Sequence, residues 1–354
     1  MDLFDGIYKG KKVLVTGDTG FKGSWLCIWL KEMGADVYGY ALPATSSRDN
    51  YVTCGLQSRI HHADGDIRDK EKLISFFNTV KPDVAFHLAA QPLVIESYNN
   101  PHYNFETNLM GTVNFFEAVR QCSSVKAAIN VTTDKCYQNN EWVWGYREND
   151  PMGGDDPYSA SKGCSELITA SYIKSFFSKP GTAHVASARA GNVIGGGDWA
   201  DNRIIPDMMR AYMTNSISVI RNPASVRPWQ FVLEPLFGYL KLGEKLLTDG
   251  KHFTGGWNFG PAAYENYTVG NVVNQVKTRI PSLKIDAPET GEKLHEAGLL
   301  KLDITKAVNL LGWKPKLNFE QTIAFTIDGY LFEIEEKGNI YQSRVEQINA
   351  YCKH

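Results

Sequence analysis

Two residues that could move a proton, Tyr158 and Lys162, stand four positions apart in a stretch that predicts a helix over residues 158–177. This spacing places both side chains on one face of the helix. A neighbouring ammonium favours the phenolate and lowers the pKa of a tyrosine, so we expect Tyr158 to accept a proton from an alcohol near neutral pH. The pair is therefore a candidate for alcohol oxidation, provided that a hydride acceptor lies beside it.

Four polar residues, Thr132, Thr133, Asp134 and Lys135, follow an apolar run that predicts a strand over residues 127–131. A hydride-transfer site needs polar groups at the carboxyl ends of parallel strands, and these residues fall there. Tyr158 and Lys162 come next along the chain. This order favours one shared catalytic site over a chance pairing of a tyrosine and a lysine.

A glycine-rich loop, Gly17-Asp18-Thr19-Gly20-Phe21-Lys22-Gly23, joins the first predicted strand to the first predicted helix. In that place glycines allow a tight turn, close approach of the backbone to a pyrophosphate, and helix-to-strand packing, while the helix N-terminus faces the phosphates. We therefore predict that a dinucleotide binds here. Asp18 would repel a pyrophosphate unless Lys22 or an outward rotamer compensates.

The loop leaves the choice between NAD and NADP open. The second predicted strand ends after Tyr40 without the acidic residue that takes the ribose hydroxyls in NAD enzymes. Arg48 could read a 2′-phosphate, or it could be a solvated loop arginine. Further on, Asp66 beside Ile67 could reach the adenine amino group, or it could form a turn and cap a helix.

The elements that must position these residues alternate as in βαβ units. We predict an α/β fold with a Rossmann-type, doubly wound parallel sheet in residues 1–190. After Ala190 the pattern predicts a smaller mixed α/β substrate-binding lobe over 191–354, with segments at about 225–260 returning to the sheet. The expected strands are 12–16, 36–40, 83–88, 127–131 and 184–188, and the expected helices are 24–33, 70–78, 105–121 and 158–177.

The composition argues against several kinds of partner. The chain has 37 basic and 39 acidic residues, a net charge of -2 and no long run of one sign. The sequence therefore shows no concentration of positive charge that would bind nucleic acid or an anionic membrane. No apolar run approaches the roughly 20 residues that span a bilayer, so a cytoplasmic location and a small-molecule partner are expected. Neither the cysteines nor the histidines have zinc-ligand spacing, so no metal is expected, and His61 and His62 are interpreted as solvated loop residues.

The chain resembles the extended short-chain dehydrogenase/reductase family over nearly its whole length. The matching segments are the glycine loop, His87-Leu88-Ala89-Ala90-Gln91, Asn108, and Tyr158-Ser159-Ala160-Ser161-Lys162. Within that family, Thr133-Asp134 is similar to the Thr-Asp-Glu signature of the nucleotide-sugar 4,6-dehydratases. The Asp134-Lys135 pair looks like the members of this group that act on CDP-glucose and open the route to the 3,6-dideoxyhexoses of bacterial O-antigens.

The resemblance implies a three-step reaction with a regenerated NAD. Tyr158 takes the proton of the C4 hydroxyl while NAD takes the C4 hydride, and Thr133 hydrogen-bonds the same oxygen. The 4-keto group then acidifies C5–H, water leaves from C6 with Asp134 as the acid, and the hydride returns to C6. Relatives carry a glutamate as the C5 base where this chain has Lys135, so the lysine is either the base or a stabiliser of the enolate.

The resemblance also implies which residues contact each ligand. Asn192, Arg203 and Arg227 would hold the diphosphate of a nucleotide sugar, with CDP-glucose expected, and Gln91 and Glu96 would line the hexose site. The implied cofactor contacts are Gly17, Thr19, Gly20, Phe21, Lys22, Gly23, Asp66, Ile67, Leu88, Ala89, Ala90, Asn108, Thr132, Tyr158 and Lys162.

Assembly and alternative functions complete the expectations. Helices 105–121 and 158–177 are expected to pair across a two-fold axis, giving a homodimer or homotetramer. Three alternatives stay open: another nucleotide-sugar 4,6-dehydratase, a nucleotide-sugar 4-epimerase, and a dinucleotide-sensing protein without catalysis. An epimerase would keep the tyrosine and lysine but would have no need of Asp134.

Overall fold

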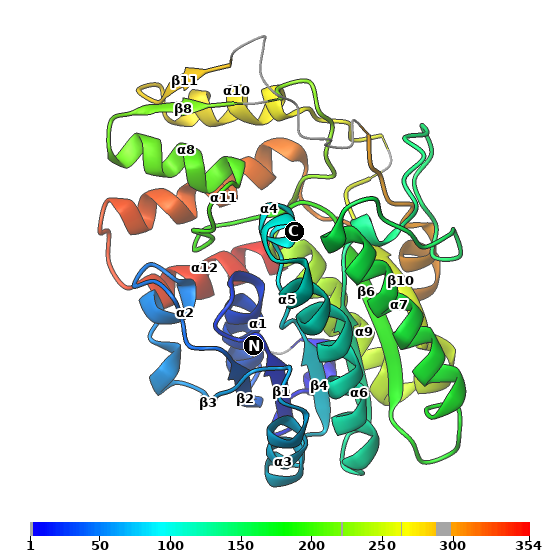
Figure 1. The fold of residues 1–354 in the computed structure, drawn as a ribbon. Coiled ribbons are helices and arrows are strands. Elements are labelled where there is room, and N and C mark those ends of the chain that lie inside the picture. Colours follow the sequence, from blue (N-terminus) through cyan, green and yellow to red (C-terminus); the bar gives the residue numbers. More distant parts are fainter. Residues whose placement is uncertain (1–2, 221, 263, 288–298) are drawn as a thin grey trace.

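A seven-stranded parallel sheet forms the centre of the molecule, with the order β10-β6-β5-β4-β1-β2-β3 (Figure 1). The computed structural model describes residues 3–220, 222–262, 264–287 and 299–354. Because the order of the strands reverses between β1 and β4, the loops after these two strands diverge, and open α/β sheets bind ligands at such a point. The strands are β1 (Lys12–Thr16), β2 (Asp36–Ala41), β3 (His61–Asp64), β4 (Val84–His87), β5 (Ala127–Val131), β6 (His184–Ala190) and β10 (Gly255–Phe259).

Both faces of the sheet are covered by helices. On β1, Leu14 belongs to the core under one helix layer, whereas Val13 and Val15 belong to the core under the other. Burial on both faces explains why these strands read as continuous apolar runs. The predicted doubly wound α/β fold is confirmed. The first layer holds α3 (Lys70–Val80), α6 (Gly111–Gln121) and α7 (Pro157–Ser175), and the second holds α1 (Phe21–Glu32) and α9 (Leu233–Thr248).

Some elements differ from the expectation. β3 and β10 were not among the readable strands, because β3 is a polar edge strand and β10 starts with two glycines. The helix expected over 105–121 is three segments: α5 (Pro101–Phe105), a π-helical turn (Glu106–Met110) and α6. The short helices α2 (Asn50–Thr53) and α4 (Val94–Asn99) were not expected either.

A smaller group of elements packs around its own apolar core at the carboxyl edge of the sheet (Figure 1). It contains α8 (Ile204–Met213), α10 (Val269–Arg279), α11 (Phe319–Ile334), and the parallel pair β8 (Ile217–Val219) and β11 (Lys284–Asp286). In a second parallel pair, β7 (Val193–Ile194) and β9 (Gln230–Phe231), β9 contacts both α11 of this group and α9 of the sheet layers. The last helix, α12 (Ile340–Lys353), packs against α1 and α11. The division of the chain at residue 190 stays a prediction.

Residues 3–220, 222–262, 264–287 and 299–354 offer neither a membrane-spanning helix nor a metal cluster. None of the helices in that part of the chain is long and apolar enough to cross a bilayer. The same residues contain no group of three or more histidine, cysteine or acidic side chains that could hold a metal ion.

Candidate active site

The glycine loop after β1 makes a tight turn and packs closely against the loop after β4. Gly17 has a φ of +76°, and a Cβ there would lie 2.6 Å from the backbone nitrogen of Ala89 in the loop after β4. A Cβ on Gly23 would lie 2.0 Å from the carbonyl oxygen of Gly17. The loop runs into the N-terminus of α1, whose N-cap is Gly20. These features fit the pyrophosphate of a dinucleotide.

Asp18 is turned away from that position. Its side chain is fully buried, Oδ2 lies 2.7 Å from Nδ1 of His62, and the carboxylate packs against Gly39. Burial raises the pKa of Asp18 although the hydrogen bond to His62 opposes the rise, and Asp18 in turn raises the pKa of His62. The carboxylate therefore sits under the loop rather than facing a pyrophosphate. The interpretation of His61 and His62 as loop residues was wrong, because both lie in β3. His62 pairs with Asp18, whereas His61 is exposed.

The residues predicted to contact the adenosine part of the cofactor, Asp66 and Arg48, interact with other side chains of the protein. Arg68 donates to both carboxylate oxygens of Asp66, at 3.0 and 3.1 Å from Nε. The N-cap of α3 is Asp69, not Asp66. Arg48 lies 5.0 Å from the ring centre of Trp199, in the smaller group of elements, so the structure gives this arginine a packing role.

Asn108 ties the loop after β4 to α7. Its Nδ2 lies 3.0 Å from the carbonyl oxygen of Gln91 and 2.9 Å from Oγ of Ser161, and its Oδ1 accepts from the backbone N–H of Gln91. The side chain of Gln91, expected near the substrate, is instead bonded to the backbone of Leu93 through both its oxygen and its nitrogen. This network fixes the loop Leu88-Ala89-Ala90 beside the glycine loop.

Tyr158 lies in the first turn of α7, next to Thr133. Its backbone N–H donates to Oγ of Ser97 in α4 at 3.1 Å. Burial raises the pKa of Tyr158 to about 12, although the hydrogen bond with Thr133 and the charge of Arg203 lower it. The expectation of a lowered tyrosine pKa is therefore wrong, because desolvation outweighs the hydrogen bond with Thr133 and the charge of Arg203.

Two lysines from different elements share this site. Burial lowers the pKa of Lys162 to about 8, against the opposing charge of Glu166. Burial also lowers the pKa of Lys22 to about 7, and the positive charges of Lys162 and Arg203 lower it further. Nζ of Lys22 lies 6.0 Å from the ring centre of Tyr239 in α9. Lys22, expected at the pyrophosphate, therefore extends toward the catalytic residues.

Asp134 has the features of a proton donor. Its Oδ1 accepts from Oγ1 of Thr133 at 2.9 Å, whereas Oδ2 is buried without a hydrogen-bond partner among the described residues. Burial raises the pKa of Asp134, and the nearby charges of Lys135 and Arg227 oppose the rise. A carboxyl group with a raised pKa and one unbonded oxygen can hold a proton and give it to a leaving hydroxyl. Lys135 itself is half-buried.

The arginines expected at the diphosphate face the same residues. Nη1 of Arg203 lies 2.8 Å from Oδ2 of Asp198, and the positive charge of Arg203 lowers the pKa of Tyr158. Arg227 is buried, and its positive charge opposes the rise in the pKa of Asp134. Asn192 lies between β6 and β7, where its carbonyl oxygen accepts from the N–H of Gln230. Glu96 is half-buried in α4.

Three residues around this site were missed by sequence reasoning: Asp198, Tyr239 and Glu166. Asp198 and Tyr239 come from distant segments with no motif of their own. Glu166 had a readable signal, because it follows Lys162 by four residues on the same helix and so lies on the same face.

The sheet, the glycine loop, and Thr133, Tyr158 and Lys162 at its carboxyl edge define a dinucleotide-dependent enzyme of the extended short-chain dehydrogenase/reductase class. The chain belongs to the family described as GDP-mannose 4,6 dehydratase, which matches residues 14–326.

Individual relatives agree with this assignment. The chain is 49% identical over 320 residues to CDP-glucose 4,6-dehydratase of Salmonella typhimurium, covering 89% of each chain. Among solved structures, an epimerase from Methanothermobacter thermautotrophicus has a TM-score of 0.82 at 24% identity, covering 97% of each chain. The dTDP-glucose 4,6-dehydratase of Bacillus anthracis in complex with NAD has a TM-score of 0.76 at 22% identity, covering 92% of this chain and 98% of that one. The two structural similarities show the fold.

Proposed function

We propose that this enzyme converts CDP-glucose to CDP-4-keto-6-deoxyglucose by oxidation at C4, loss of water across C5 and C6, and reduction at C6. The observation that carries the proposal is the 49% identity to the Salmonella typhimurium CDP-glucose 4,6-dehydratase over 89% of both chains. The gathering of Thr133, Asp134, Tyr158 and Lys162 in one site supports it.

The cofactor that we propose is NAD, which supplies a reversible hydride acceptor when bound. We assign the pyrophosphate to the glycine loop, whose tight packing at Gly17 and Gly23 supports the assignment, and the ribose hydroxyls to Lys162, which is buried in α7. NAD is also the ligand of the Bacillus anthracis dTDP-glucose 4,6-dehydratase. The residue that the sequence offered for a 2′-phosphate, Arg48, packs on Trp199 instead, which favours NAD over NADP.

We assign the proton transfers to two residues. Tyr158 takes the proton of the C4 hydroxyl while Thr133 hydrogen-bonds the same oxygen. With a pKa of about 12, the phenol needs positive charge beside it to react near neutral pH. Arg203 lowers the pKa of Tyr158, and Lys22 lies close to both Arg203 and Lys162. Once the 4-keto group has acidified C5–H, Oδ2 of Asp134 gives its proton to the departing C6 hydroxyl.

The base that removes the C5 proton has two candidate assignments. Lys135 either takes this proton itself or stabilises the enolate while another group does so. Turnover of CDP-glucose by Lys135→Ala in deuterated water separates the two. If Lys135 is the base, the variant incorporates no deuterium at C5. Rapid incorporation at C5 would show that another group is the base.

A panel of nucleotide-activated glucoses, each incubated with NAD or NADP, tests the function as a whole. We expect the 4-keto-6-deoxy product to form fastest from CDP-glucose with NAD. Preference for another base would indicate a different nucleotide-sugar 4,6-dehydratase. Formation of a 4-epimer with no keto product would overturn the proposal in favour of an epimerase.

We further propose that the enzyme is a cytoplasmic homodimer or homotetramer whose product feeds 3,6-dideoxyhexose synthesis for O-antigens. Exposed apolar side chains on the α6 and α7 side of the molecule support the assembly, with exposed fractions of 46% for Met110, 60% for Leu167 and 40% for Phe176. A charge at Leu167 should weaken such an interface. We expect light scattering to find a smaller species for Leu167→Lys than for the natural chain, and an unchanged mass would contradict this surface.

A further inference from the structure

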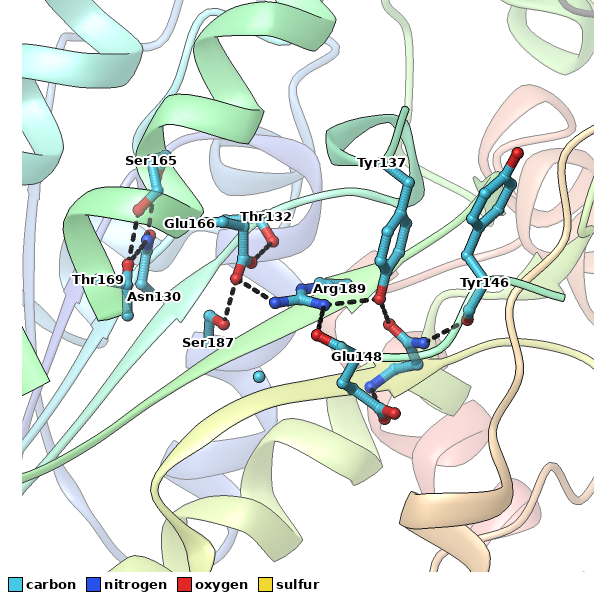
Figure 2. Close-up of polar contacts among 12 residues, drawn as sticks. Asn130, Thr132, Tyr137, Tyr146, Glu148, Ser165, Glu166, Thr169, Ser187 and Arg189 are labelled. Carbon is cyan, nitrogen blue, oxygen red and sulfur yellow. Dashed lines mark hydrogen bonds and ion pairs between the residues drawn. The ribbon is translucent and has the colours of Figure 1, made fainter. Parts of the chain in front are cut away.

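A buried ion pair joins Glu166 in α7 to Arg189 in β6, next to Thr132 (Figure 2). Nη2 of Arg189 in β6 donates to Oε2 of Glu166 in α7 at 2.6 Å, and the two side chains are 6% and 3% exposed. Oγ of Ser187 donates to the same carboxylate at 2.7 Å, and Oγ1 of Thr132 donates to its other oxygen. Burial raises the pKa of Glu166, but Arg189 and the two hydroxyls outweigh it and the net shift is downward. Glu166 is therefore ionised at neutral pH.

The pair holds both ends of the turn that carries Thr133, Asp134 and Lys135. Thr132, bonded to Glu166, comes immediately before the turn. Tyr137 comes two residues after it, and its hydroxyl accepts from Nη1 of Arg189 at 2.6 Å (Figure 2).

Further contacts anchor the arginine and the tyrosine to the surrounding chain. The Tyr137 hydroxyl donates onward to Oδ1 of Asn258 in β10 at 2.7 Å. Nη1 of Arg189 also donates to the carbonyl oxygen of Glu148 at 3.1 Å. The turn is thus fixed from two sides by one buried network.

The same carboxylate acts on Lys162, one helical turn earlier. The titratable groups that interact with Lys162 are Lys22 from α1, His87 from β4, Cys136 from the turn, and Glu166 from its own helix. Tyr158 lies one turn earlier on that helix, four residues from Lys162 and so on the same face. Burial lowers the pKa of His87 to about 3 and raises the pKa of the Cys136 thiol, so both are neutral near pH 7. Of these groups, Glu166 is the one that carries a negative charge.

We propose that Glu166 is a positioning residue for the reaction: it holds the turn that carries Thr133 and Asp134, and it keeps Lys162 in the ammonium form beside Tyr158. The part that concerns turnover rests on the proposed function. The part that concerns the charge of Lys162 does not, and it can be measured without substrate.

The test compares Glu166→Gln, which keeps the size of the side chain and removes its charge, with Thr169→Val on the same helix. Thr169 is buried and accepts from Nδ2 of Asn130 at 2.9 Å, within a separate cluster that holds Ser165 (Figure 2). The titration of Lys162 is followed by nuclear magnetic resonance of the full chain containing [6-13C]lysine, with the signal identified by its loss in Lys162→Arg.

We expect the titration midpoint of Lys162 to move to lower pH by about one pH unit in Glu166→Gln, because a nearby opposite charge favours the charged form. The basic limb of the kcat profile with CDP-glucose should move in the same direction. Turnover should fall roughly 10-fold to 100-fold while KM changes little, because the turn is misplaced. Thr169→Val should leave the Lys162 midpoint and the position of the basic limb unchanged.

An unchanged Lys162 midpoint in folded Glu166→Gln would overturn the charge role. If that variant fails to fold, Glu166→Asp decides instead, since its carboxylate is withdrawn from Lys162: a smaller shift to lower pH supports the role, and no shift overturns it. Tyr137→Phe removes one anchor of the turn without touching Glu166. It should lower kcat and leave the Lys162 midpoint in place, and full activity would overturn the positioning role. Absence of CDP-glucose turnover by the natural chain would instead count against the proposed function, and the Lys162 titration would still decide the charge role.

Discussion

Two buried carboxylates, Asp18 after β1 and Asp134 after β5, have much in common and differ in what surrounds them. Each has one bonded oxygen and one oxygen without a hydrogen-bond partner among the described residues. Burial raises the pKa of both. Asp18 is packed against Gly39 with His62 as its partner, whereas Asp134 has the charges of Lys135 and Arg227 nearby.

Burial and a raised pKa therefore do not by themselves mark a catalytic group. Asp18 lies between the glycine loop and β2 and β3, where it supports the loop. Asp134 lies among Thr133, Lys135, Lys22 and Arg227, which come from three segments: the turn after β5, the start of α1, and the stretch before β9. A carboxyl group becomes a candidate acid when other reactive groups converge on it.

The largest effect is expected for Tyr158→Phe, in the same site as Asp134. Loss of the phenol removes the group that takes the C4 proton, so turnover should fall by about 10²–10⁴-fold. Substrate binding should be largely kept, because the ring remains in place. Steady-state kinetics and calorimetric titration with CDP-glucose measure the two quantities. Activity close to that of the natural chain would remove Tyr158 from the mechanism and favour a non-catalytic role for the site.

The matched variants Asp18→Asn and Asp134→Asn test whether the two carboxylates differ in function. Each keeps the size of a buried side chain and removes its acid. We expect Asp134→Asn to lower formation of the 4-keto-6-deoxy product by about 10²-fold, since it loses the proton donor for the C6 hydroxyl. Asp18→Asn should cost clearly less turnover. Equal losses in the two variants would break the distinction between a supporting and a catalytic carboxylate.

The smallest effect is expected in the pH dependence of stability at the Asp18 end. Asp18 raises the pKa of His62 in the folded chain. The stabilisation is therefore fully present below the ordinary histidine pKa of about 6.5 and is lost as the pH rises through the raised folded value. The melting temperature of the natural chain should fall over that window.

In Asp18→Asn the melting temperature should fall less over the same pH range, and calorimetry across that range can measure the difference. Asp64→Asn is the control, since Asp64 lies 3.1 Å from Nε2 of His62 but its side chain is 67% exposed. Its effect should be smaller, because solvent screens an exposed pair. If the melting temperatures of the natural chain and of Asp18→Asn depend on pH in the same way, the coupling between Asp18 and His62 is contradicted.

The fold could be predicted where a strand is an apolar run that ends in a motif. β1 runs into the glycine loop and β5 runs into Thr132, so both could be placed from local sequence. β3 could not, because an edge strand with two histidines and an aspartate has no apolar run. β10 could not, because its first two residues are glycines that also suit a turn.

The site could be predicted where its residues are neighbours in a motif, as with Tyr158 and Lys162. The directions of the side chains could not be. Asp18 and Lys22 belong to the same loop, yet one turns under it toward β3 and the other extends toward Lys162. The contact of Arg189 with Tyr137 could not be predicted either, because the two residues are 52 positions apart and meet only through tertiary packing. Spacing gives the place of a residue on an element, and tertiary packing decides what the residue faces.

The most direct test of the central claim is the fate of deuterium in CDP-glucose labelled at C4. A 4,6-dehydratase that stores and returns the hydride should deliver this deuterium to C6 of the same molecule, so that mixed labelled and unlabelled substrate gives no crossover. Deuterium that remains at C4 of a 4-epimer, or that is lost to solvent without reaching C6, would contradict the proposed function.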